Sequence, residues 1–222
     1  MRPSVASLAG ALGALAVLAP ALSAPADRAV AAASTVQTDF SCYLQSRAVR
    51  VSGSGFDPGA QYTVSVDGTA LGPGTVKSDG SISGTLDSGR LSGAAPVTHQ
   101  LSVAEGSNQA TATFQVTGFT ARFSPSTGDP RTLLVSYSVY GFAPGSPSGQ
   151  PLYLHYRSPS GNGGETIHIG HTNPPCGTVT HSRLRHLFPF SPRAGTWTLQ
   201  IDTSATYSAK SQPRVVRSVT VR

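Results

Sequence analysis

The chain has 222 residues, of which only 12% are charged, while glycine and proline together number 41. The net charge is +6, and nearly all basic residues are arginine, since Lys77 and Lys210 are its two lysines. This composition is typical of many short strands joined by turns, and the alternation of Val, Leu, Tyr and Phe argues against a disordered chain.

Residues 1–33 are predicted to be a signal peptide with a short leader. Arg2 supplies a positive start, an uncharged Ala- and Leu-rich stretch covers residues 5–22, and small residues follow it. The alternative is a membrane anchor, but the stretch is short and weakly flanked. No later segment is apolar enough to span a membrane, so we expect a secreted protein, free or associated with the cell wall.

A pentapeptide of the form Gly-Phe-x-Pro-Gly occurs twice, at residues 55–59 and 141–145, which are 86 positions apart. Each copy stands between two alternating, strand-like runs, at residues 47–52 and 62–66 and at residues 133–140 and 152–156. A strand, turn and strand repeated at domain-sized spacing predicts two related β-domains.

The first predicted domain covers residues 34–117. Its turn dipeptides, Asp67-Gly68 and Asp79-Gly80, separate alternating runs. The expected strands are 38–44, 47–53, 61–67, 74–77, 81–86, 97–104 and 109–116. Seven short strands at this spacing are typical of an immunoglobulin-like β-sandwich.

The second predicted domain covers residues 118–222 and has longer loops. Its expected strands are 119–124, 132–140, 151–157, 165–170, 177–188, 195–202 and 214–221. Beyond the pentapeptide, we align Gly84-Thr85 with Gly177-Thr178 and residues 97–103 with 196–201. The predicted fold class is therefore all-β, with two tandem immunoglobulin-like sandwiches after the signal peptide.

The first domain resembles the immunoglobulin-like, IPT/TIG-type repeats of actinobacterial surface and secreted proteins. The residues that carry this resemblance are 51–59, Asp67-Gly68, 78–81 and 110–116. The second domain is similar to a more divergent relative, on residues 175–178, 187–190 and 194–198. The resemblance implies adhesion, wall association or display, and it carries no catalytic residues.

Two cysteines, Cys42 and Cys176, leave one possible disulfide, which an exported chain favours over the alternative of two buried free thiols. Neither has a second Cys or His at the spacing of a metal site. His168 and His171 are three residues apart, and on a strand such residues face opposite sides unless one lies in a turn. We therefore expect no metal site and no cofactor.

Alternation along the second domain predicts a basic outer face. Leu184 and Phe188 are taken as inner residues of their strand, and Ile167 and Ile169 as inner residues of theirs. The outer surface predicted in this way also carries Tyr153 and His155. The candidate contact residues are Arg157, His168, His181, Arg183 and Arg185.

The charge is divided unequally between the two halves of the chain. Residues 118–222 contain ten basic and three acidic side chains, a net of +7, whereas residues 34–117 have a net charge of −2. This difference indicates an anionic envelope polymer or a surface protein as the partner. No nucleic-acid motif accompanies the charge, so no specific nucleic acid is expected. The alternative is a solvated surface that serves solubility.

No catalytic constellation emerges from the sequence, so we predict a non-catalytic binding or adhesion protein. Two alternatives stay open. A secreted hydrolase requires a serine to converge with His155 and Asp202. A small-ligand carrier requires a pocket lined by Tyr140, Phe142 and Tyr153.

Overall fold

The structure, a computed structural model, describes residues 33–222 except 92 and 162. The predicted signal sequence lies almost wholly outside the described residues. Within the described part, the regular elements are β-strands and one 3-10 helix, which confirms the all-β prediction. No helix found there is long and apolar enough to cross a membrane.

The first sandwich, as we call β1 to β8, consists of two sheets with strand orders β1-β3-β6 and β2-β8-β7-β4-β5. Its core contains Val49, Leu101 and Phe114, which come from both sheets. The strands are β1 (Thr35–Thr38), β2 (Cys42–Leu44), β3 (Ala48–Ser54), β4 (Gln61–Val66), β5 (Thr69–Thr75), β6 (Ile82–Asp87), β7 (Val97–Glu105) and β8 (Asn108–Thr117), with the 3-10 helix η1 (Ser88–Arg90) after β6.

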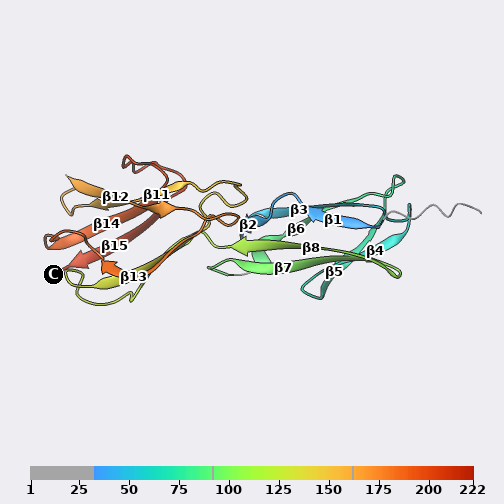
Figure 1. The fold of residues 1–222 in the computed structure, drawn as a ribbon, viewed down its shortest axis with the longest axis horizontal. Helices are drawn as coiled ribbons and strands as arrows, with labels where there is room; N and C mark the ends of the chain where they lie inside the picture. Colours follow the sequence, from blue (N-terminus) through green and yellow to red (C-terminus); the bar gives the residue numbers. More distant parts are fainter. Residues whose placement is uncertain (1–32, 92, 162) are drawn as a thin grey trace, which may run out of the picture. The chain divides into compact units, whose positions relative to one another are not determined.

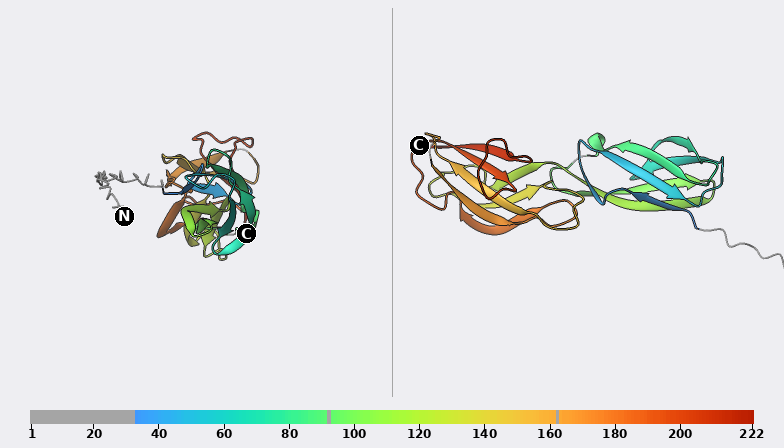
Figure 2. Two further views of the ribbon diagram at one scale, coloured as in Figure 1. Left: turned by 90° about the vertical axis from the view of Figure 1, so that its right-hand side faces the viewer. Right: turned by 90° about the horizontal axis from the view of Figure 1, so that it is seen from above.

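The second sandwich, β9 to β15, has sheets of order β13-β10-β9 and β12-β11-β14-β15 (Figure 1). Its strands are β9 (Thr120–Ser124), β10 (Leu134–Tyr140), β11 (Pro151–Arg157), β12 (Gly164–His171), β13 (Val179–His186), β14 (Gly195–Asp202) and β15 (Val215–Val221). The core contains Val139, Leu152 and Leu199, and it is separate from the core of the first sandwich. Figure 2 shows the two layers of each sandwich from other sides.

The two sandwiches repeat one topology. In sequence order β3 to β8 correspond to β10 to β15, and β1 corresponds to β9, with the same neighbours in the sheets. β2 is the exception, because it pairs in parallel with β8 and has no counterpart beside β15 among the described strands. The predicted division at residues 117 and 118 stays a prediction, since residues 32–222 group as one compact unit.

The glycines of the repeated pentapeptide adopt the same backbone conformation in both copies. φ is 83° at Gly55 and 79° at Gly59, and 82° at Gly141 and 78° at Gly145. A side chain is disfavoured at such φ values, and glycine reaches them without a steric cost. The motif therefore recurs because the chain makes the same pair of turns after β3 and after β10.

The phenylalanine of each pentapeptide packs into the core of its own sandwich, and its backbone makes an equivalent hydrogen bond. Phe56 N donates to Gly80 O at 3.2 Å, and Phe142 N donates to Gly177 O at 3.1 Å. A Cβ on Gly80 would lie 2.8 Å from Phe56 O, and one on Gly177 would lie 1.6 Å from Phe142 O. Gly80 and Gly177 are therefore equivalent positions.

This equivalence corrects the predicted alignment of Gly84-Thr85 with Gly177-Thr178. With Gly80 matched to Gly177, Ile82 corresponds to Val179, and both side chains are buried at the start of their strands. Sequence alone misplaced the match because Gly-Thr recurs in the segment, and the backbone hydrogen bond is what selects the right glycine.

Two strand predictions also change. The run 38–44 is interrupted, because the chain leaves β3, the partner of β1, and joins β8 through β2. The expected strand 74–77 is β5, which begins at Thr69 directly after the predicted turn. Asp67 and Gly68 have φ values of 50° and 78°, as a two-residue hairpin turn requires.

Cys42 of β2 and Cys176 of the loop before β13 form the predicted disulfide, with 5.3 Å between their Cα atoms. This Cα separation is ordinary for a disulfide. The bond joins positions 134 residues apart and connects the first sandwich to the second.

Candidate functional site

Three of the predicted contact residues lie on β13, at the edge of the sheet β13-β10-β9. Arg183 and Arg185 are exposed, whereas His181 is half-buried. His181 Nε2 donates to the carbonyl of Ile169 at 2.8 Å, and its ring lies 4.7 Å from that of Tyr137. His181 therefore bridges β13 to β12 and is not a free surface group.

The predicted inner and outer sides of β13 are reversed. His181 pairs with Tyr137 and Arg185 with Val135, and both partners are buried core residues, so these side chains leave β13 on its core side. Leu184, predicted to be inside, is 58% exposed. Phe188 is buried as predicted, but it follows the end of the strand, so it does not report the strand's alternation.

Arg185 reaches solvent from the core side because β13 is an edge strand and its side chain is long. Its charge still acts on the interior. Burial raises the pKa of the Tyr137 hydroxyl, and the positive charge of Arg185 opposes that rise. Arg185 thus lies at the rim of the core.

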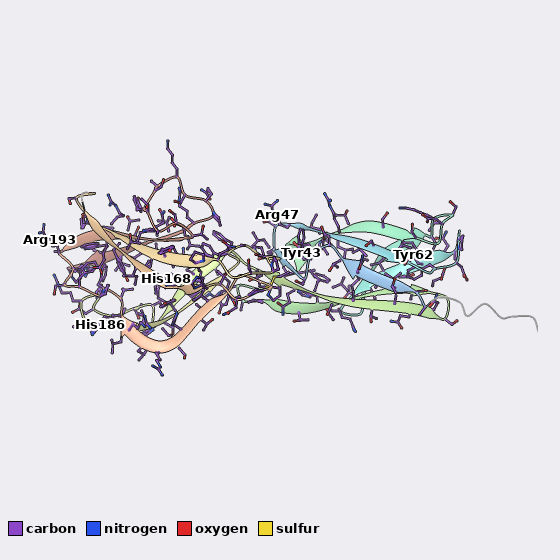
Figure 3. The ribbon with its side chains drawn as sticks, turned by 45° about the horizontal axis from the view of Figure 1, so that its top comes forward. Tyr43, Arg47, Tyr62, His168, His186 and Arg193 are labelled. Carbon is purple, nitrogen blue, oxygen red and sulfur yellow. A yellow bond between two sulfur atoms is a disulfide. The ribbon has the colours of Figure 1, made fainter. Side chains whose placement is uncertain are left out.

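Arg157 and His168 lie on the other sheet, on β11 and β12, so the five candidates do not share one sheet face. Arg157 is half-buried, its guanidinium lies 4.5 Å from the ring centroid of Tyr207, and it donates to the carbonyl of Gly161. His168 is exposed, and Ile169 beside it is buried, as predicted. Figure 3 labels His168 on β12 and His186 on β13.

His168 and His171 lie together, contrary to the expectation for strand residues three apart. Their ring centroids are 5.0 Å apart, because a bulge interrupts the pairing of β12 with β11 next to Gly170, where φ is 126°. The ring of Tyr153 also lies 5.3 Å from that of His168. Among the described residues, no group of three or more His, Cys, Asp or Glu side chains is placed to hold a metal ion.

His155 was expected on the outer surface, but it is fully buried, with a relative exposure of 0%. Its Nε2 donates to Asp202 Oδ1 at 3.1 Å, and its Nδ1 lies 2.8 Å from Thr166 Oγ1. Asp202 is also buried, at 1% exposure. These polar side chains do face away from the core, but a loop covers them.

That loop is the connection between β14 and β15, and a network around Asp202 fastens it to the sheet. The carboxylate of Asp202 accepts from Ser204 N at 2.8 Å and from Gln200 Nε2 at 2.6 Å. Gln200 Nε2 also donates to Ser208 O at 2.8 Å, and the ring of Tyr207 lies 5.7 Å from that of His155. Buried polar groups that are hydrogen-bonded in this way specify one conformation of the loop.

The hydrolase alternative required His155 and Asp202 to meet, and they do. Their third partner is the hydroxyl of Thr166 rather than that of a serine. A triad histidine must transfer a proton to and from a bound substrate. Because the imidazole of His155 is enclosed beneath Tyr207, substrate has no access to it.

The carrier alternative required a pocket lined by Tyr140, Phe142 and Tyr153, and the burial of Phe142 does not favour it. Phe142 is fully buried in the core. A groove of about 770 Å³ opens elsewhere, between β9 and β15, with Arg122 and Arg217 at its rim.

Sequence reasoning missed this groove and its arginines, although one signal was available. The inward positions of β15 include Val215, Val219 and Val221, and Arg217 interrupts them. A charge on the inward side of an apolar strand is typical of a sheet edge.

Among the described residues, the arginines of the second sandwich form no ion pairs. Within residues 33–222 apart from the two gaps, the ion pairs are His99 with Asp67 and His155 with Asp202, and no arginine pairs with a carboxylate. Arg185 pairs with Val135 through the backbone, but the guanidinium groups of Arg183 and Arg185 make no hydrogen bond among the described groups. Their charges are therefore directed to solvent.

No protein-family model matches the chain, and no curated protein shows a significant match to its sequence. Solved structures do match. They include a tetra-tandem repeat from the extending region of a large adhesion protein, with 17% identity over 85% of this chain and 49% of that chain at a TM-score of 0.30. Red sea bream transglutaminase matches with 15% identity over 84% and 31%, at a TM-score of 0.30. Invasin, a bacterial integrin-binding protein, matches with 12% identity over 86% and 40%, at 0.33. The chain spans less than half the length of each of these structures, and likenesses this distant leave its function to be argued from its own residues.

Proposed function

We propose that this is an exported, non-catalytic binding protein that attaches to an anionic polymer of the cell envelope through Arg183 and Arg185 of β13. The observation that carries the proposal is the pair of exposed arginines on one edge strand, with no carboxylate partner among the described residues. They belong to a half of the chain with a net charge of +7. Charge of one sign on one half attracts a partner of the opposite sign.

The spacing and chemistry of the pair suit a repeating polyanion. Arg183 and Arg185 are two residues apart on an edge strand, in the stretch where its pairing with β10 is irregular, so both guanidinium groups can contact one polyanion chain. The planar guanidinium forms two parallel hydrogen bonds with a phosphate or a carboxylate. Teichoic acids and acidic glycans carry such groups at regular intervals.

Exposed histidines lie on both sheets of the second sandwich. His168 and His171 are on β12, and His186 is on β13. Their imidazole N–H groups can donate hydrogen bonds to the oxygens of a bound polyanion.

Two of the five residues predicted for this surface take another role in the proposal. His181 is occupied by its bond to the backbone of β12, and Arg157 by its contacts with Tyr207 and Gly161. The proposed contact set is therefore Arg183, Arg185 and His168, with Arg157 and His181 as supports of the surrounding structure.

The disulfide supports the proposed location. Disulfides form and persist in oxidising compartments outside the cytosol. Cys42 and Cys176 are bonded, so an extracellular setting fits the chain. Association with the wall itself is part of the proposal.

Charge reversal tests the proposal. The variant Arg183→Glu/Arg185→Glu is expected to bind purified wall teichoic acid at least about tenfold more weakly, because attraction becomes repulsion at the contact. Binding is measured by calorimetry, with neutral dextran as the negative control polymer.

The matched control is Arg193→Glu/Lys210→Glu, which changes the net charge equally at exposed positions outside β13. It is expected to retain most of the affinity. Equal loss in both variants would mean that net charge, and not the β13 pair, governs binding, and it would contradict the proposal.

A further inference from the structure

The second sandwich lacks a strand that the first sandwich has. In the first sandwich, β2 lies in parallel beside β8, with Cys42 opposite Gln115 and Leu44 opposite Thr117. β15 corresponds to β8, yet among the described strands it pairs with β14 alone. The segment between β9 and β10, which corresponds in order to β2, forms no strand. One edge of β15 therefore presents unpaired backbone groups.

A groove follows this open edge. It runs between β9 and β15, has a volume of about 770 Å³, and reaches down to Val135 and Leu187, which belong to the core. Phe123, Leu133 and Val219 line it and are only partly buried. Apolar side chains that remain half-covered gain free energy when another apolar group covers them.

The rim of the groove is basic. Arg122 and Arg217 line it, and Arg131 and Arg222 lie where it continues past Thr220, with Asp129 as the carboxylate there. Arg217 bridges the opening by donating to the carbonyl of Ala121 at 3.4 Å. This distance is longer than that of a typical hydrogen bond, so a carboxylate can displace the carbonyl at little cost.

We infer that this groove is a docking site for an extended acidic segment of a partner protein, which adds to β15 as a parallel strand in the place that β2 takes beside β8. Main-chain hydrogen bonds to a free sheet edge supply affinity, and alternate side chains supply specificity. Alternate apolar side chains of the segment enter the groove between Phe123 and Val219. Its intervening acidic side chains lie on the outer side with Arg122 and Arg222, and the exposed side chain of Arg217 reaches the rim from the inward side of β15.

This site is distinct from the polymer contact proposed on β13. β9 and β15 are edges of their sheets, and β13 and β12 are the opposite edges of the same two sheets. The two proposals therefore predict different sets of sensitive arginines, and each can fail without the other.

The test uses fluorescein-labelled peptides of about nine residues, a common strand length. One alternates valine and glutamate, a second alternates valine and lysine, and a third is the first with two central residues replaced by proline, which cannot complete a strand ladder. Fluorescence anisotropy with the purified protein is expected to show saturable binding of the valine–glutamate peptide. At least about tenfold weaker binding is expected for the other two.

Variants and hydrogen exchange locate the binding. Arg217→Glu is expected to weaken the valine–glutamate complex at least about tenfold, as is Arg122→Glu/Arg222→Glu, which leaves the Arg217 bridge intact. Arg183→Glu/Arg185→Glu is the matched control and is expected to bind unchanged. Amides of β15 should gain protection from exchange in the complex. Absence of binding, equal binding of all three peptides, or protection confined to β12 or β13 would overturn the inference.

Discussion

At the scale of single residues, the main surprise is His155, which belongs to a buried network rather than to the surface. Its imidazole connects Thr166 of β12 to Asp202 of β14, and Asp202 in turn fixes the loop that follows. The three side chains resemble a catalytic constellation in connectivity. Because they are buried, their role is to hold the β14–β15 loop against the sheet.

Replacement of His155 tests this structural role. His155→Ala removes the partner of a buried carboxylate and opens a cavity beneath Tyr207, so it is expected to lower the free energy of unfolding by about 3 kcal/mol. Urea unfolding measures the loss, and hydrogen exchange of residues 203–214 should rise. The control is Thr166→Val, which removes a hydroxyl at the exposed end of the network and is expected to cost less than about 1.5 kcal/mol. A stable His155→Ala variant with a protected loop would contradict the role.

At the scale of elements, the position of a charged side chain in a turn or on an edge strand determines what it contributes to stability or binding. The β4–β5 turn is one example, because Asp67 fastens it to β7. Asp67 Oδ1 accepts from Gln100 N at 2.8 Å, and Oδ2 lies 2.7 Å from His99 Nδ1. The bond from the Gln100 backbone, followed by the bond with His99, lowers the pKa of Asp67 below its ordinary value of 3.8.

This lowered pKa predicts a specific pH dependence. A carboxyl whose pKa is lower in the folded state stabilises the fold above its unfolded value, and that contribution is lost as the pH falls through the folded value. The variant Asp67→Asn keeps a residue that tolerates positive φ but removes the charge. We expect it to be less stable than the wild type at pH 7, by a margin that shrinks as the pH falls below about 4. Thermal unfolding across pH measures the margin, and a margin that does not change with pH would contradict the assignment.

The sequence predicted elements well where a local rule determines them. The two glycines of each pentapeptide, and the Asp67-Gly68 turn, follow from backbone conformation alone. Ile167 and Ile169 correctly placed His168 outside, since Ile169 is buried and Ile167 packs against the core on either side of the exposed His168. β13 was assigned the wrong way round because its alternation was counted from Phe188, beyond the end of the strand.

The site itself was less predictable. Arg183 and Arg185 were correctly expected to be exposed, but their grouping with Arg157 required a sheet assignment that the sequence does not contain. The burial of His155 depends on a loop that folds back over the sheet from residues 203–214. Such long-range covering leaves no periodic pattern in the strand that it covers.

At the scale of the whole molecule, the two sandwiches share a topology but differ in the sign of their net charge. The first sandwich is acidic overall and the second basic, although the strand orders of their sheets correspond. Shared topology thus determines the architecture, whereas the surface residues of one copy carry the proposed binding. The disulfide covalently connects the two sandwiches.

Removal of the disulfide should lower the free energy of unfolding, because the unfolded chain gains conformational entropy when the cross-link is absent. The bond closes a loop between positions 134 residues apart, and in the chain-entropy model such a closure contributes about 4–5 kcal/mol. Cys42→Ser/Cys176→Ser is therefore expected to unfold at lower urea than the wild type. A reducing agent should shift the wild type toward the variant and leave the variant unchanged. Equal midpoints in oxidised wild type and variant would contradict a stabilising role.

The most direct test of the proposed binding is retention of the purified protein on isolated cell envelopes of its own organism. Retention is measured from about 50 to 500 mM salt, for the wild type and for Arg183→Glu/Arg185→Glu. We expect retention that weakens with salt and that disappears in the variant. Retention that ignores salt and survives in the variant, or no retention under any condition, would contradict it.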